Sequence, residues 1–214
     1  MCNLYDIGPA PNSDRSAWEK QVGKACEALP KRHHIRKTDP GIVARNSSAG
    51  PESEPQPAVM RWGFHRAFNP SVNNARDDKL DSDLWRRAFA ERRCAIPVAA
   101  FYEWTGPRGH KQTHAFRRAD GRWLWAAGIW EESREHGPCY SLVTTEAAPW
   151  MEAFHHRMPA LLDAGKVVEY LEGADPRSLI APRVEALEPF PCENPLKLSE
   201  PQPPVPGYQK ELWD

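Results

Sequence analysis

RCAIPVAAFYEW, residues 93–104, is a run of apolar and aromatic side chains that predicts β-strand structure. Pro97 is expected to break this strand, because proline has no backbone N–H to donate to a neighbouring strand. Working outward, further strands are expected at 58–64, 113–118, 122–130 and 139–145. Successive strands with few helices between them are typical of an antiparallel sheet. We therefore expect an α+β fold, mainly antiparallel sheet curled toward a barrel, with a few flanking helices.

Helical spacing is confined to a few short segments, as 22 prolines in 214 residues would suggest. Trp18, Val22, Ala25 and Leu29 predict a helix over 14–29 that Ser13 or Asp14 can cap. Other helices are expected at 80–92, 163–172 and 176–182. The segment 46–57 has the composition of a polar loop, and the Pro-rich tail 189–214 is expected to lie along the surface. With neither a linker nor a repeat, residues 1–214 are expected to form a single compact domain.

Composition and charge pattern limit the classes of function that this chain is expected to have. The formal net charge is −1, yet residues 61–122 hold 13 Lys/Arg against 7 Asp/Glu, which fits either a local polyanion site or a solvated basic face. No apolar run approaches 18 residues and no signal segment is visible, so we expect a cytoplasmic protein, nucleoid-associated when on DNA. The five cysteines form no CxxC pair, and Cys26, His33 and His34 lack a suitably spaced fourth ligand. We expect reduced thiols, no metal and no cofactor.

The second residue, Cys2, follows the initiator methionine. Removal of Met1 would leave a free α-amine and a thiol on adjacent carbons, a 1,2-aminothiol that can close a five-membered thiazolidine ring with an aldehyde. Both groups are partly in their nucleophilic forms near neutral pH. The alternative is that Cys2 is a small inert hydrophobic residue.

Five other residues carry candidate chemistry. Glu103 lies among three aromatic side chains, which would raise the pKa of its carboxyl and suit a proton shuttle, unless it faces water at a strand end. His155 can exchange a proton near neutral pH, although His156 competes for that role. Arg76 and Arg157 can each bind a phosphate in a forked geometry or form an ordinary ion pair. Trp62 can stack on a nucleic-acid base or belong to the core.

Taken together, these residues resemble the SRAP (SOS-response-associated peptidase) family, whose members trap abasic sites in single-stranded DNA. The resemblance covers about residues 1–165. It is carried by Met1-Cys2, Arg61-Trp62-Gly63, Asn74-Ala75-Arg76, Arg93–Pro97, Phe101–Trp104, Ala127–Glu131, Thr144-Thr145 and His155–Pro159. It implies one compact α+β domain with a positively charged groove leading to Cys2.

The resemblance also implies a role for each matching residue. Cys2 would be the nucleophile that forms a covalent thiazolidine crosslink with the ring-opened deoxyribose, and Asn74 would hold the abasic sugar or the Cys2 amine. Glu103 would shuttle protons, and His155 would assist formation and reversal of the Schiff base. The residues implied in DNA binding are Trp62, Arg76, Arg86, Thr145 and Arg157.

The chain departs from the family pattern in three places. Family members commonly begin Met-Cys-Gly-Arg, whereas Asn3 and Leu4 stand here, so one expected phosphate contact is missing. Residues 65–70 replace the usual apolar turn, and Asp77 and Asp78 follow Arg76.

Two other functions remain open. Cys2 can serve as the N-terminal nucleophile of a cysteine peptidase, including removal of Met1 by the protein itself, or the chain can be a non-catalytic single-stranded-DNA-binding module. In each DNA-based reading the expected partner is single-stranded DNA, bound by a monomer that has no contact with a membrane.

Overall fold

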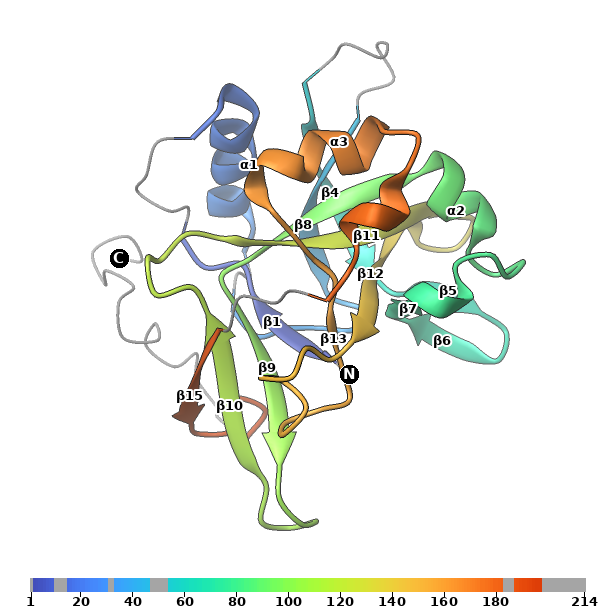
Figure 1. Ribbon diagram of the computed structural model, residues 1–214. Coiled ribbons are helices and arrows are strands. Elements are labelled where there is room, and N and C mark those ends of the chain that lie inside the picture. The colour runs from blue at the N-terminus through green and yellow to red at the C-terminus, as the bar shows by residue number, and fades with distance from the viewer. Residues whose placement is uncertain (1, 10–14, 31–32, 47–53, 183–186, 198–214) are drawn as a thin grey trace.

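A closed ring of five strands forms the centre of the molecule (Figure 1). The computed structural model describes residues 2–9, 15–30, 33–46, 54–182 and 187–197. Within them, β12 pairs in parallel with β4 and antiparallel with β11, and the ring closes through antiparallel β4–β3, β3–β8 and β8–β11 pairs. These strands are β3 (Pro40–Arg45), β4 (Gln56–Trp62), β8 (Arg93–Val98), β11 (Leu124–Ser133) and β12 (Gly137–Glu146). Closure removes the exposed sheet edges that an open sheet of these apolar strands would leave.

Short strands extend the barrel. β7 (Asn74–Arg76) pairs in parallel with β12, and β13 (Arg157–Pro159) pairs antiparallel with the same strand. β14 (Leu161–Leu162) pairs with β11. β5 (Phe64–Arg66) and β6 (Asn69–Val72) form a separate hairpin. β12 is thus the strand to which the Asn74 and Arg157 segments are both attached.

A second, five-stranded sheet lies beside the barrel in the order β15-β10-β9-β1-β2 (Figure 1). Its strands are β1 (Leu4–Asp6), β2 (Ile35–Arg36), β9 (Ala100–Thr105), β10 (Gln112–Arg117) and β15 (Glu188–Cys192). All of its pairs are antiparallel. The tail was expected to lie along the surface from residue 189, but residues 189–192 belong to this sheet, and residues 198–214 lie outside the described part of the chain.

The segment 93–104 belongs to both sheets, and its break lies at Ala99 rather than at Pro97. Pro97 stays within β8, in register with Trp125. At Ala99 the chain leaves the barrel, and the Ala99 N–H donates to Asp6 O (2.7 Å) instead of to a barrel strand. One continuous run therefore couples the barrel to the strand that follows Cys2.

Helices cover the barrel at α1 (Ala17–Ala28), α2 (Arg86–Glu91) and α3 (Val167–Glu172) (Figure 1). The cap of α1 is Ser16, which forms a capping box with Glu19; the expected caps Ser13 and Asp14 lie outside the described residues. The helix expected at 80–92 is shortened to α2 and is preceded by a 3₁₀ turn, η1 (Asp77–Lys79). The helix expected at 163–172 is divided into a 3₁₀ turn, η2 (Ala164–Lys166), and α3. The segment expected to be helical at 176–182 forms a 3₁₀ turn, η3 (Pro176–Leu179). The expected α+β fold of mainly antiparallel, barrel-like sheet with flanking helices is confirmed.

Apolar side chains from both sheets meet in one core. Tyr5 and Phe101 of the second sheet are buried in the same cluster as Ile96, Trp125 and Leu142 of the barrel. In the described part of the chain, no helix is both long and apolar enough to cross a membrane.

Candidate active site

Two asparagines hold the start of β1 in place. Asn74 Nδ2 donates a hydrogen bond of 2.9 Å to the Cys2 carbonyl oxygen, and Asn73 Nδ2 approaches the same oxygen at 3.5 Å. Asn73 Nδ2 also donates to Asn3 Oδ1 at 3.1 Å. Because β7 is paired to β12, these contacts fix the Cys2 backbone against the barrel. The Cys2 side chain is fully buried, and its Sγ contacts Leu4 O at 3.5 Å.

Glu103 on β9 is the acidic group whose negative charge affects the pKa of the Cys2 thiol. Only 3% of Glu103 is exposed, and burial raises the pKa of its carboxyl to about 7. Burial, followed by the negative charge of Glu103, raises the pKa of the Cys2 thiol to about 12. The thiol is therefore protonated at neutral pH, and the neighbouring carboxyl titrates in the range where it can exchange a proton.

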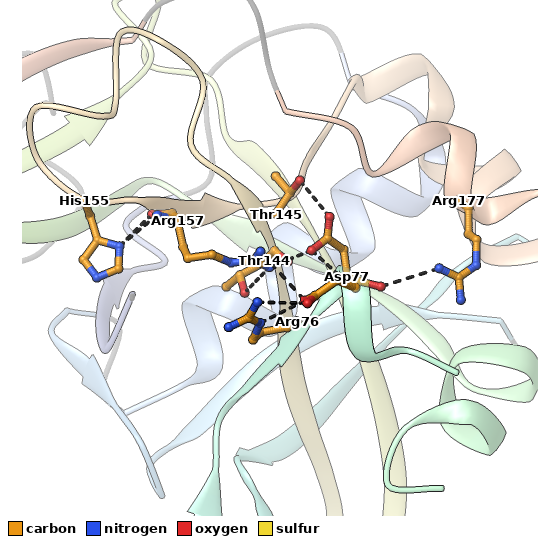
Figure 2. A network of polar contacts seen from close by, with 8 residues as sticks. Arg76, Asp77, Thr144, Thr145, His155, Arg157 and Arg177 are labelled. Carbon is orange, nitrogen blue, oxygen red and sulfur yellow. Dashed lines mark hydrogen bonds and ion pairs between the residues drawn. The ribbon is translucent and has the colours of Figure 1, made fainter. Parts of the chain in front are cut away.

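His155 precedes β13 and is held by the backbone of Arg157. The Arg157 N–H lies 2.9 Å from His155 Nδ1, and the Arg157 carbonyl oxygen lies 3.1 Å from the same nitrogen, so the Arg157 backbone fixes the ring (Figure 2). Burial lowers the pKa of His155 to about 4, so the imidazole is neutral at pH 7. The His156 ring stacks on it, with centroids 4.3 Å apart.

Asp77 is the centre of a polar network that engages Arg157 (Figure 2). Arg157 Nη2 donates to Asp77 Oδ1 at 2.7 Å and to Thr144 O, while Thr145 Oγ1 donates to Asp77 Oδ2 at 3.0 Å. The Arg157 side chain is only 5% exposed. Its guanidinium is thus buried and already paired with a carboxylate, and Thr145 is turned toward the same carboxylate.

The other two candidate arginines are accessible. Arg76 donates through Nε and Nη2 to the two Asp78 carboxylate oxygens at 2.8 and 2.9 Å, and half of its side chain is exposed. Arg86, at the first position of α2, is 68% exposed beside Asp83. Both guanidinium groups can meet solvent, so a phosphate can reach them from outside.

Trp62 lies in the core, not at a surface. It is fully buried, its ring makes an edge contact with Tyr5, and its Nε1 donates to Asn73 O at 2.9 Å. This ring offers no face to a nucleic-acid base. Trp62 instead supports Asn73, and through Asn73 the Cys2 backbone. The expected stacking of Trp62 on a base does not fit this buried position.

The structure places Asn74 and Glu103 next to Cys2. It adds two residues that sequence reasoning missed: Asn73, which shares the Cys2 carbonyl, and Asp77, which pairs with Arg157. Their adjacency to Asn74 and Arg76 was the only available signal. Among the described residues, Cys26 does not join His33 and His34 in a metal-ligand cluster.

Comparison with known proteins finds a matching family model and several relatives. A family model described as SOS response associated peptidase (SRAP) matches residues 1–195. Three curated relatives are named abasic site processing proteins: one from Saccharomyces cerevisiae (26% identity; 50% of this chain, 32% of the relative), HMCES of Gallus gallus (28%; 51% and 43%) and YoaM of Bacillus subtilis (28%; 53% and 52%). The matched region spans about a third to a half of the length of these relatives.

Solved structures support the fold. A protein from Bacteroides thetaiotaomicron superposes with a TM-score of 0.73 at 20% identity, covering 94% of this chain and 97% of the other. A protein from Bordetella bronchiseptica gives 0.69 at 23% identity, with 90% and 100% covered.

Proposed function

Since this chain belongs to the SOS response associated peptidase (SRAP) family, we propose that it processes abasic sites in single-stranded DNA by forming a covalent thiazolidine through Cys2. The observation that carries the proposal is the 2.9 Å hydrogen bond from Asn74 to the Cys2 carbonyl, which positions the nucleophile beside the buried Glu103. The names of the curated relatives supply the substrate class.

The proposed reaction starts from the protein without Met1. The Cys2 amine adds to the aldehyde of the ring-opened deoxyribose, and loss of one water gives an imine. The Cys2 sulfur then adds to the imine carbon, the nitrogen accepts a proton, and the thiol loses one. The products are one thiazolidine and one water, so neither an oxidant nor a reductant is needed.

Glu103 is the proposed proton carrier. Burial disfavours the thiolate and raises the pKa of the Cys2 thiol, so the thiol needs a base close by, and the buried Glu103 carboxyl can accept that proton and later return it. Protonation of Glu103 also removes the negative charge that disfavours the thiolate. The same group can donate a proton to the sugar ring oxygen when the ring opens.

His155 and Asn74 orient the reactants. The neutral His155 ring, held at Nδ1 by the Arg157 backbone, can hydrogen-bond a hydroxyl or water during formation and reversal of the imine. Asn74 holds Cys2, which reduces the entropy lost when amine and aldehyde meet.

Arg76 and Arg86 are the proposed direct phosphate contacts, because both are accessible. Arg157 and Thr145 are held by Asp77 and would meet a phosphate only if Asp77 moved away. An abasic strand has no base to extrude at the lesion, so single-stranded DNA needs no unpairing step.

A denaturing gel tests the proposal. Protein shown by intact mass to lack Met1 is mixed with an oligonucleotide that carries one abasic site, beside an intact strand. We expect a slow-migrating covalent band with the abasic strand alone, absent for both Cys2→Ala and Cys2→Ser. The matched control Cys192→Ser removes a half-buried thiol elsewhere and should keep the band.

Three other outcomes would contradict crosslinking through Cys2 and favour a different function. A band that persists in Cys2→Ala would place the crosslink on another residue. Binding to DNA without a band from the processed protein would indicate a non-catalytic binding module. Cys2-dependent cleavage of peptides without a DNA band would indicate a cysteine peptidase.

A further inference from the structure

A cluster of three ligand side chains lies where the β5–β6 hairpin meets the β11–β12 turn. His65 comes from β5, and Glu135 and His136 come from the turn. One ligand atom from each residue lies within 4.8 Å of the other two. None of the three takes part in the Cys2 site.

The spacing of these atoms suits a transition metal. His65 Nδ1 lies 3.2 Å from Glu135 Oε2, and His136 Nε2 lies 3.9 Å from the same oxygen. Tetrahedral Zn²⁺ with bonds of about 2.0–2.1 Å separates its ligand atoms by about 3.3–3.4 Å. Small rotations of the exposed His136 and Glu135 side chains are therefore enough to complete three bonds. Two imidazoles and one carboxylate are also ligands that Zn²⁺ prefers.

The backbone holds the turn in position without a metal. Ser133 Oγ accepts hydrogen bonds from the N–H groups of Glu135 and His136, both at 3.3 Å. Gly137 follows with φ +68°, a conformation that favours glycine. The two ligands of the turn are thus presented together by local structure.

The charge around the cluster is compatible with a cation. The nearest cation along β5, Arg66, is paired in two places with Glu131, at 2.5 and 2.8 Å. This pair neutralises the arginine and also ties β5 to β11. Arg66 is thus paired away from Glu135, whose Oε2 lies against the two histidines.

We propose that His65, Glu135 and His136 bind one Zn²⁺ ion, with water in the fourth position. The ion links two segments separated by about 70 residues and fastens the β5–β6 hairpin to the β11–β12 turn. The site is independent of the proposed abasic-site chemistry.

Calorimetric titration of the full chain with Zn²⁺ tests the site. One ion per chain is expected, and His65→Ala and His136→Ala should each weaken binding at least tenfold, equal to about 1.4 kcal/mol. Glu135→Gln should weaken it less, because the amide oxygen can still ligate. The matched control His110→Ala, which changes an exposed histidine in the β9–β10 loop, should bind as the parent does.

Hydrogen exchange provides a second measurement. Zn²⁺ should slow amide exchange across residues 64–72 in the parent and not in His65→Ala. Binding that is unchanged in His65→Ala and His136→Ala, or no uptake of Zn²⁺ by a folded parent, would overturn the proposal. Circular dichroism of each metal-free variant distinguishes lost ligands from lost fold.

Discussion

Glu103 shows how a single buried carboxyl links stability to chemistry. Its pKa in the folded protein, about 7, lies above the ordinary value of 4.5 for a glutamate, because burial disfavours the charged form. The folded protein therefore binds more protons than the unfolded chain between these two values. The stability contributed by the protonated carboxyl is complete below about pH 4.5 and is lost as pH rises through about 7.

We expect Glu103→Gln to be more stable than the parent at pH 8, by about 3 kcal/mol at most, and to lose the fall in stability between pH 5 and 8. The same variant should form the crosslink slowly, because the proton carrier is gone. Urea unfolding at pH 5 and pH 8 measures the first effect, and the denaturing gel measures the second. An identical pH dependence in both proteins would show that Glu103 does not titrate in this range.

Trp62 provides a second test at the scale of the residue. Trp62→Phe removes the Nε1–H donor, but the Asn73 carbonyl still accepts from the Leu142 N–H at 3.0 Å, so the loss should be about 0.5–1.5 kcal/mol. Thermal unfolding should show this loss, while the affinity for an intact single strand should stay unchanged. A weaker affinity in the folded variant would place Trp62 at the DNA interface.

At the scale of the element, the η1 turn sets how many arginine charges are left unpaired for the proposed phosphate contacts. Its Asp77 and Asp78 pair with Arg157 and Arg76, which lie on β13 and β7. A phosphate that approaches Arg76 must compete with Asp78 for the guanidinium.

We expect Asp78→Asn to bind an intact single strand more tightly, with a steeper salt dependence, by about 0.7 in the log–log slope for one added phosphate contact. Fluorescence anisotropy over a series of salt concentrations measures this slope. The control Asp120→Asn breaks a similar exposed pair with Arg118 beyond β10 and should leave the slope unchanged. Equal slopes for Asp78→Asn and the parent would exclude Arg76 from the phosphate contacts.

Element boundaries were only partly predictable. The box Ser16–Glu19 is visible in the sequence and starts α1, whereas the expected start lay two to three residues earlier. The break at Ala99 was hidden, because it arises from a hydrogen bond to Asp6, more than 90 residues away. Local patterns therefore located the elements and misplaced some of their ends.

At the scale of the whole molecule, the closed barrel and the second sheet share one continuous stretch of chain, residues 93–104, and one hydrophobic core. Ile96 and Phe101 lie on either side of the Ala99 break and are buried in the same cluster. Neither sheet can open without exposing apolar surface of the other.

We therefore expect residues 1–214 to unfold as one cooperative unit. Urea transitions followed by tryptophan fluorescence and by far-ultraviolet circular dichroism should coincide, since tryptophans lie in both sheets. Two separated transitions would show that the sheets are independent domains.

The sequence by itself determined the strand-rich fold class and singled out Cys2, Asn74 and Glu103 as candidate site residues. Each belongs to a short local motif whose residue types are visible without any pairing partner. Only the tertiary structure decided that Trp62 is buried, that Arg157 is paired with Asp77, and that His65 meets Glu135. The members of each long-range pair are about 70 to 80 residues apart, and such proximity is created by strand pairing across the barrel, which no local pattern encodes.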